Sequence, residues 1–185
     1  MLDVVNDQLV IEEKGIYSIE KFLIARRLMY WQVYLHKTVI SVENTLIKIL
    51  KRAKQLIQNG EDIFSSSALK IFLKNNYTVN NFKENDDILE SFSKLDDHDI
   101  YSCIKEWANH DDFILSSLSD RILNRNPLKI KTQKEKFSEN KNNEIKQKVS
   151  DKYNISIKDT NYLVFTNKVS NNAYHYHKAH INILM

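Results

Sequence analysis

Cysteine, glycine, proline and long apolar runs are all scarce in this sequence, and each shortage excludes something. The 185 residues contain one Cys, Cys103, so no internal disulfide can form and a reducing, cytoplasmic compartment is expected. No apolar run reaches the roughly 18–20 residues that a membrane-spanning helix needs, and the N-terminus has no basic region ahead of an apolar stretch, as a signal peptide would. The net charge is only +3, from 27 basic and 24 acidic residues, which indicates neither nucleic acid nor an anionic membrane as the main partner.

Because there are only two Gly and one Pro, these residues mark boundaries. In residues 1–14, apolar residues lie on both sides of the turn pair Asn6-Asp7, which predicts a short β-hairpin. A helical pattern then runs from about residue 18, with Ser18 as the expected N-cap, to about residue 59, where Gly60 suits a C-terminal cap. One long helix is predicted there, with a bend or two shorter helices as the alternative.

The remaining chain predicts more helices and a few strands. Helices are expected at about 65–75, 96–109, 111–124 and 138–152, with a polar stretch at 76–95 that is weakly helical around residues 88–92. Pro127 marks a predicted boundary, and strands are expected at 128–131, 162–165 and 181–184. The predicted fold class is therefore mainly α: a helical region at 1–126, and at 127–185 a small α+β lobe that is incomplete. A hairpin at one end and a strand-like segment at the other indicate a fragment of a larger protein.

One helical face carries residues that a nucleotide could use. Arg26, Tyr30 and Tyr34 are spaced i, i+4, i+8, so they fall within about 80° of each other on a helix, and Lys37 lies inside that arc. A guanidinium forms a planar fork for phosphate oxygens, and a Tyr ring packs against a sugar or a base. The alternative is structural: aromatic side chains at helical spacing commonly form a core, and Arg with Lys a solvated edge.

The same stretch, GIYSIEKFLIARRLMYWQVYLHK, resembles the HD-domain deoxynucleoside triphosphate triphosphohydrolases, which include bacterial dGTPase-like enzymes and an animal antiviral restriction enzyme. Further similar segments follow in the same order: LDDHDIYSCIKEWANHDD, ILSSLSDRILNRNPLK, YLVFTNKVSNNAYHY and HINIL. The resemblance thus extends over nearly the whole chain. It implies a helical-bundle fragment of an HD-domain phosphohydrolase, whose full enzyme hydrolyses a dNTP to a deoxynucleoside and triphosphate.

The resemblance implies substrate-binding roles for three residues. Arg26 would contact a substrate phosphate, Tyr30 would lie near the phosphates and sugar, and Tyr34 would pack against the deoxyribose and disfavour a 2′-hydroxyl. Leu35 stands where the animal enzyme has a Gln that helps to fix the substrate, so that contact is not expected here.

Four basic residues match an allosteric nucleotide site that some family members have. They are His36 and Lys37 in the first similar block, and Arg125 and Lys129 in the later Arg-x-x-x-Lys. Salt bridges at the lobe boundary are the alternative role for Arg125 and Lys129.

The family's catalytic metal motif is missing from these residues. The resemblance implies a divalent metal held by His, a His-Asp pair and a later Asp, which precede the matching region, so this chain supplies no catalytic residue and no metal ligand. His98-Asp99 imitates the pair, but its acidic surroundings predict the start of a helix instead. His175, His177 and His180 could share a metal, although a surface loop is the preferred interpretation.

The sequence therefore predicts part of a dNTP hydrolase that is inactive by itself. It would contribute substrate-positioning, oligomerisation and regulatory residues, with a dNTP, a regulatory nucleotide and further copies of the chain (a dimer or tetramer) as partners. A non-catalytic nucleotide-binding or assembly module, and a helical interaction domain without a ligand, are the alternatives. Cys103 and both Trp residues, Trp31 and Trp107, are expected in packing roles.

Overall fold

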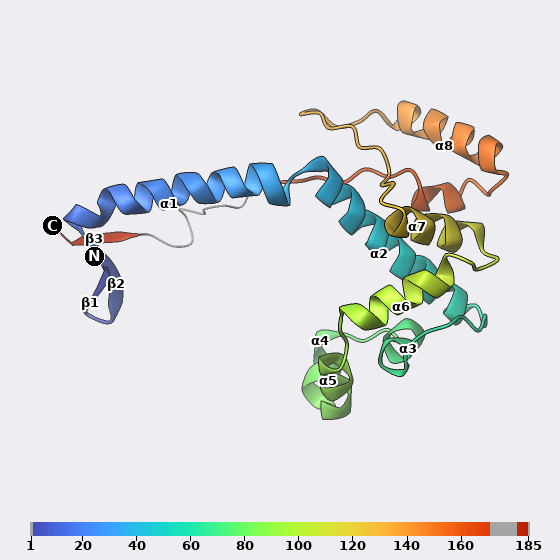
Figure 1. Cartoon of the computed structure of the whole chain (residues 1–185), viewed down its shortest axis with the longest axis horizontal. Helices are drawn as coiled ribbons and strands as arrows, with labels where there is room; N and C mark the ends of the chain where they lie inside the picture. Colours follow the sequence, from blue (N-terminus) through green and yellow to red (C-terminus); the bar gives the residue numbers. More distant parts are fainter. Residues whose placement is uncertain (1, 171–180, 185) are drawn as a thin grey trace. The chain divides into compact units, whose positions relative to one another are not determined.

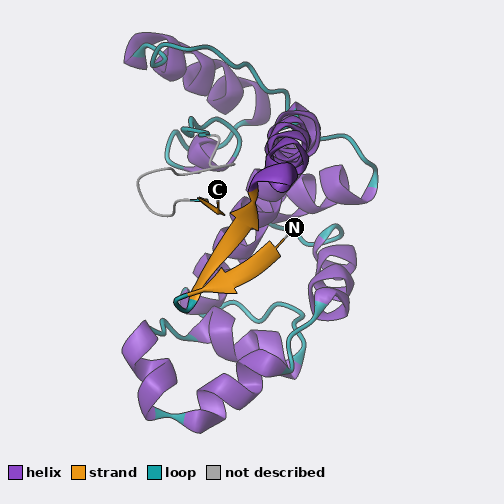
Figure 2. Ribbon diagram, turned by 90° about the vertical axis from the view of Figure 1, so that its left-hand side faces the viewer, coloured by secondary structure: helices purple, strands orange, loops and turns teal. Residues whose placement is uncertain are grey.

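The computed structural model describes residues 2–170 and 181–184, most of them in helices (Figures 1 and 2). The chain divides into two compact units, Met1–Ile40 with Asn167–Met185, and Ser41–Thr166. The mainly helical class predicted from the sequence is confirmed. Pro127, where the sequence placed a boundary, lies inside the second unit.

The first unit begins with the predicted hairpin. Its strands are β1 (Leu2–Val5) and β2 (Gln8–Glu12), paired antiparallel, and β2 also pairs in parallel with β3 (Asn182–Leu184). The turn residues Asn6 and Asp7 have φ values of 51° and 60°, the backbone of a type I′ turn, which both residue types tolerate. The hairpin and the strand at 181–184 are thus confirmed.

The long helix predicted at 18–59 is interrupted. After a 3₁₀ turn, η1 (Glu13–Gly15), come α1 (Ile16–Met29), a π-helical turn η2 (Tyr30–Tyr34) and α2 (Lys37–Gln58). The chain leaves helical geometry at Leu35, so two helices form, as the stated alternative allowed. The N-cap prediction was wrong: α1 starts two residues before Ser18, with Gly15 at its N-cap.

The end of α2 is the predicted glycine cap. Gly60 has a φ of +95°, its N–H donates to the Ile57 carbonyl at 3.0 Å, and the Glu61 N–H donates to the Leu56 carbonyl at 3.0 Å. This pair of hydrogen bonds is a Schellman motif, which satisfies carbonyls that the end of a helix leaves unpaired.

The second unit contains the rest of α2 and six further helices among the described residues. They are α3 (Ser67–Lys74), α4 (Val79–Glu84), α5 (Asp86–Ser93), α6 (Asp97–Trp107), α7 (Phe113–Leu123) and α8 (Glu139–Tyr153). Four of these were predicted to within a few residues. The stretch at 76–95 is more helical than predicted, since rings of Phe72, Tyr77, Phe82 and Phe92 pack around one another at centroid distances of 5.7–6.3 Å.

Acidic residues begin two of these helices, as predicted. Asp96 accepts hydrogen bonds from the N–H groups of His98 and Asp99 at 2.8 and 3.1 Å, and Asp99 accepts one from the Asp96 N–H in return. Asp112 accepts from the Leu115 N–H at 2.8 Å. These carboxylates satisfy donors that have no partner inside the helix.

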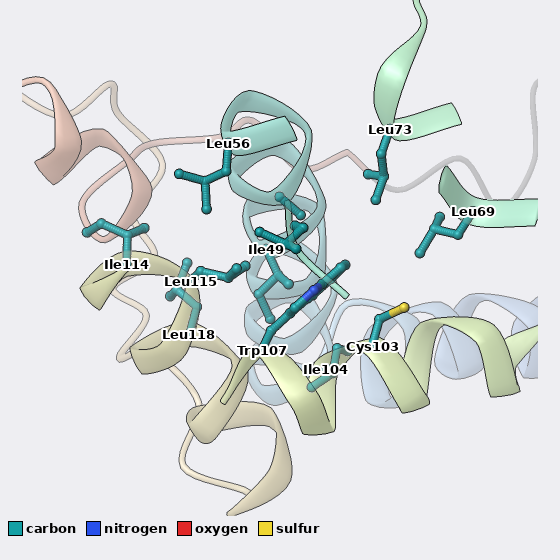
Figure 3. Close-up of a cluster of buried hydrophobic side chains, with 12 residues drawn as sticks. Ile49, Leu56, Leu69, Leu73, Cys103, Ile104, Trp107, Ile114, Leu115 and Leu118 are labelled. Atoms are coloured by element: carbon teal, nitrogen blue, oxygen red, sulfur yellow. The ribbon is translucent and has the colours of Figure 1, made fainter. Parts of the chain in front are cut away.

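A single apolar core joins α2, α3, α6 and α7 (Figure 3). Ile49, Trp107 and Leu115 lie at its centre with exposures of 0–1%, and the Trp107 indole donates to the Phe64 carbonyl at 2.8 Å. Cys103 is also fully buried, so the packing roles of Cys103 and Trp107 are confirmed. Trp31 is 59% exposed, so its predicted packing role is wrong for the described residues.

Two predicted strands are absent from the described residues. At 128–131 the backbone is irregular, and the Leu128 carbonyl accepts a hydrogen bond from the Ser41 hydroxyl at 2.7 Å. The segment 162–165 follows a 3₁₀ turn, η3 (Asp159–Tyr162), where the Val164 N–H donates back to the Thr160 carbonyl at 2.8 Å. No strand lies beside either segment within the described chain, so neither can form the hydrogen bonds of a sheet.

Candidate functional site

The structure brings the three predicted substrate residues together on one face of the first unit. The Arg26 Nη2 lies 3.4 Å from the Tyr30 hydroxyl, and the guanidinium carbon lies 5.2 Å from the centre of the Tyr30 ring. The rings of Tyr30 and Tyr34 are 5.1 Å apart at an angle of 60°. We call these residues the Arg26–Tyr34 face.

The π-helical turn shapes this face, and the sequence analysis did not predict it. The Leu35 N–H donates to the Tyr30 carbonyl at 2.8 Å, an i→i+5 bond that widens the turn and keeps Tyr34 beside Tyr30. Single π turns inside α-helices occur frequently at functional sites. No Gly or Pro lies in the turn, so no residue in the local sequence signals it.

The face is accessible to a ligand in the described chain. Arg26 is exposed, Tyr34 is 53% exposed and Tyr30 is half-buried. A guanidinium beside two phenol rings offers charged donors for phosphate oxygens and apolar ring surface for a sugar. The arrangement can bind and orient a nucleoside phosphate, and it contains no general base or nucleophile of its own.

The surroundings of this face are strongly apolar. None of the α1 residues is buried, and seven large apolar side chains from Tyr17 to Val33 are 43–74% exposed. They are Tyr17, Phe22, Ile24, Leu28, Met29, Trp31 and Val33. Exposed apolar side chains gathered in this number on one segment ordinarily mark a surface that other protein covers.

His36 and Lys37 lie at the start of α2. The His36 Nδ1 accepts a hydrogen bond from the Thr38 N–H at 3.3 Å, so this side chain caps the helix. Lys37 is the first residue of α2 and is exposed. At this end of a helix the dipole disfavours a cation and favours a nearby anion. Both residues are accessible for the predicted regulatory role, and His36 has a structural role as well.

Arg125 and Lys129 are exposed in the segment after α7. Arg125 has a φ of 51°, and the Asn126 N–H donates to the Arg121 carbonyl at 2.9 Å, which makes Arg125 the left-handed residue of a second Schellman motif. Within the described part of the chain neither residue forms an ion pair, so the salt-bridge alternative finds no support there.

A metal centre does not fit the described residues. No group of three His, Cys, Asp or Glu side chains among them could hold an ion. His98-Asp99 belongs to the cap of α6, and the predicted cluster of His175, His177 and His180 lies outside the described residues. No helix in the described ranges has the length and apolar character needed to cross a membrane.

Sequence reasoning missed a buried ionic network in the second unit. Arg52 of α2 donates to both carboxylate oxygens of Asp112 at 3.0 and 2.6 Å, to Asp159 at 3.0 Å and to the Gln55 amide oxygen at 2.9 Å. Its side chain is only 12% exposed. The i, i+3 spacing of Arg52 and Gln55 was visible in the sequence, but the carboxylates lie 60 and 107 residues away.

The network fixes the charges of its members. Burial raises the pKa of Asp112, but hydrogen bonds from Arg52 and from the Leu115 N–H outweigh it, and the pKa lies below its ordinary value. The hydrogen bond to Asp112 raises the pKa of Arg52. The network therefore holds an ionised pair between α2 and the start of α7.

Comparison with known proteins places this geometry in context. Residues 1–72 match the family model of the HD associated region, a stretch that includes the whole Arg26–Tyr34 face. A solved crystal structure of a phosphohydrolase from Bacteroides thetaiotaomicron VPI-5482 matches with a TM-score of 0.93 and 46% identity, over 100% of this chain and 46% of that one.

Two curated bacterial proteins are also similar. YwfO of Bacillus subtilis (strain 168) is 37% identical over 120 residues, or 65% of this chain and 26% of that protein. MG461 of Mycoplasma genitalium (strain G37) is 32% identical over 130 residues, or 67% of this chain and 29% of that protein. The chain thus spans less than a third of these relatives. It has the fold of the matching part of a phosphohydrolase, and its residues 1–72 match the HD associated region.

Proposed function

We propose that this chain is the substrate-positioning and assembly part of an HD-domain phosphohydrolase that converts a dNTP to a deoxynucleoside and triphosphate. The observation that carries the proposal is the Arg26–Tyr34 face, an exposed guanidinium beside two neighbouring phenol rings, inside the stretch that matches the HD associated region. The similarity to a solved phosphohydrolase supports the hydrolase class.

Each residue of the face would have a binding role. Arg26 would donate hydrogen bonds to phosphate oxygens, and the Tyr30 ring would hold the guanidinium in place through the cation–π contact. Tyr34 would pack against the deoxyribose. Leu35 would add no polar contact to the sugar. A ribonucleotide would bind more weakly, since a 2′-hydroxyl pressed against the Tyr34 ring would lose its hydrogen bonds to water.

The reaction itself needs groups from outside the described residues. A divalent metal held elsewhere in the complete enzyme would activate water and stabilise charge on the phosphate. This chain would bind and orient the nucleotide, while His36, Lys37, Arg125 and Lys129 would take a regulatory nucleotide. By itself the chain is expected to be inactive.

The first test is nucleotide binding by the chain alone, measured by titration calorimetry with a dNTP and the matching NTP. Arg26→Gln should weaken dNTP binding about tenfold or more, because charged hydrogen bonds to phosphate are lost. Arg27→Gln is the matched control: it removes the same charge from the next, also exposed, residue of α1. Equal affinity of the two variants would contradict the proposed face.

The second test is turnover. Triphosphate release in the presence of a divalent metal should be undetectable with the chain alone and should appear when a polypeptide with the H…HD…D motif is supplied, with loss of rate in Arg26→Gln. Turnover by the chain alone that disappears in His98→Ala would show that the proposed division of roles is wrong.

A non-catalytic assembly module is the second candidate, favoured by the exposed apolar surface of α1. It would form homo-oligomers, dimers or tetramers, and bind nucleotide without hydrolysis. Nucleotide binding that depends on Arg125 and Lys129, without turnover when the metal motif is supplied, would favour this candidate. A melting temperature unchanged by excess dNTP would instead favour an interaction domain with no ligand, because a ligand that binds only the native state raises its stability.

A further inference from the structure

The second unit has a cavity whose lining is rich in lysine. It has a volume of about 260 Å³ and lies between α2 and the segment around η3. Its lining residues, which we call the lysine pocket, are Lys48, Lys51, Gln55, Lys158, Asp159, Asn161 and Tyr162. Nothing in the Arg26–Tyr34 face or the four predicted regulatory residues belongs to it.

Lys48 is held inside this pocket by fixed contacts. Its ammonium donates to the Asn161 carbonyl at 2.8 Å and lies 4.6 Å from the centre of the Phe165 ring. Lys146 of α8 donates to the side-chain oxygen of the same Asn161 at 2.6 Å. Two ammonium groups are thus positioned around one residue, and a backbone carbonyl and a ring face offset little of their charge.

The one carboxylate among the lining residues, Asp159, already accepts hydrogen bonds from other residues. One oxygen of Asp159 accepts from Arg52 at 3.0 Å, and the other accepts from the Ser156 hydroxyl at 2.8 Å. One Arg52 guanidinium is shared by two carboxylates, so this network keeps a net negative charge, which offsets only part of the positive charge of Lys48, Lys51 and Lys158. The three lysines leave a local excess of positive charge in a concave site.

The neighbouring charges also affect the pKa of Lys48. Burial and then the neighbouring charges of Lys51 and Lys146 lower its pKa. A group in this position is stabilised by a nearby anion, because the anion offsets both the lost hydration and the repulsion.

We infer that the lysine pocket binds a phosphate-bearing anion through Lys48, Lys51 and Lys158. Lysine ammonium groups are compact charges with three donors each and are common phosphate ligands. The cavity is slightly smaller than the roughly 300–1,000 Å³ of pockets for drug-sized molecules. It therefore suits a chain of phosphates, either free polyphosphate or the polyphosphate part of a nucleotide, better than an entire nucleotide. The inference does not rest on the proposed function.

The test is calorimetric titration of the whole chain with inorganic triphosphate at physiological salt. Lys51→Gln and Lys158→Gln should each weaken binding about tenfold, the loss expected for one charged hydrogen bond. Both side chains are exposed, so these variants should fold normally. Lys48→Gln should weaken binding at least as much, and its circular dichroism should match that of the wild type. Lys83→Gln on α4, an equal charge change at an exposed position outside the pocket, should bind as the wild type does.

Three results would overturn the inference. Undetectable triphosphate binding would do so, and so would equal weakening in Lys83→Gln, which would indicate general charge attraction. Loss of triphosphate binding in Arg26→Gln would place the anion on the Arg26–Tyr34 face instead. Conversely, failure of Arg26→Gln to affect dNTP binding would count against the proposed function alone.

Competition separates the two sources of phosphate. A dNTP that displaces triphosphate, with the same dependence on Lys51 and Lys158, would identify a nucleotide as an occupant. Displacement by inorganic polyphosphate but not by the dNTP would identify the free anion. Both outcomes support a phosphate site, whereas displacement by neither would contradict it.

Discussion

Removing Arg52 tests the ionic network of the second unit. We consider Arg52→Met, which retains much of the length of the side chain and removes the guanidinium. Asp112 and Asp159 are 14% and 28% exposed, so the variant leaves two carboxylates in mostly buried positions without their common partner.

The expected cost follows from burial. Breaking a buried ion pair by removing one partner typically costs about 3–5 kcal/mol. Asp112 keeps its hydrogen bond from the Leu115 N–H, and Asp159 keeps that from Ser156, so we expect a loss of about 2–4 kcal/mol. This corresponds to a fall in melting temperature of roughly 10 °C. Arg52→Lys, which retains the charge but not the two-pronged geometry, should lose about half as much.

The assay is urea unfolding followed by tryptophan fluorescence in a Trp31→Phe background. Trp107 is then the only fluorescent Trp, and it lies buried in the core of the unit that contains Arg52. The midpoint should fall for Arg52→Met. A change of less than about 0.5 kcal/mol, the scale of an exposed ion pair, would refute the reasoning.

The pH dependence gives a second check. The pKa of Asp112 is lower in the folded state than in an unfolded chain, where it would be about 3.9. Its contribution to stability is therefore complete above that value and is lost as the pH falls through the lower, folded pKa. In Arg52→Met, stability should fall less between neutral and acidic pH than in the wild type, because the pairing with Asp112 is already lost. Parallel curves of stability against pH for the two proteins would contradict a stabilising Arg52–Asp112 pair.

Three further changes have direct structural expectations. Gly60→Ala should lower the free energy of unfolding by about 1 kcal/mol, because the backbone φ of +95° is strained for Ala. No atom lies within 4 Å of the added methyl group, so backbone strain is the only expected effect, and an unchanged thermal unfolding curve would contradict it. Leu115→Ala, at a fully buried position, should cost about 2–5 kcal/mol, whereas Leu89→Ala, at a position 52% exposed, should cost less than about 0.5 kcal/mol by the same measurement. Asp7→Gly should stabilise the first unit by about 0.5 kcal/mol, because the turn needs a positive φ there, and faster amide exchange in β1 and β2 would argue against it.

Local signals predicted the parts of the fold that depend on neighbouring residues. The acidic caps at Asp96 and Asp112, the turn at Asn6-Asp7 and the stop at Gly60 are decided within a few residues, and the structure has all four. The segment 162–165 was predicted as a strand, but a short apolar run can form either a strand or a turn. The turn forms because no neighbouring strand lies beside the segment in the described chain.

The candidate sites were predictable to different degrees. The Arg26–Tyr34 face follows from helical spacing, and the structure brings its members together even though a π turn replaces the expected α-helix. The lysine pocket was not predictable, because its residues come from α2 and from a turn about 110 positions later. Spacing within one helix cannot indicate which distant segment will pack beside it.

The Arg52 network also sets an order of events during synthesis. Arg52 and Asp159 are separated by 107 residues, so at about 5–20 residues per second the ribosome needs about 5–20 s between them. During that interval Arg52 can pair with Asp112 once it is made but not with Asp159, and Lys48 has no Asn161 carbonyl to bind. The second unit can therefore complete its fold only after Asp159 and Asn161 have left the ribosome.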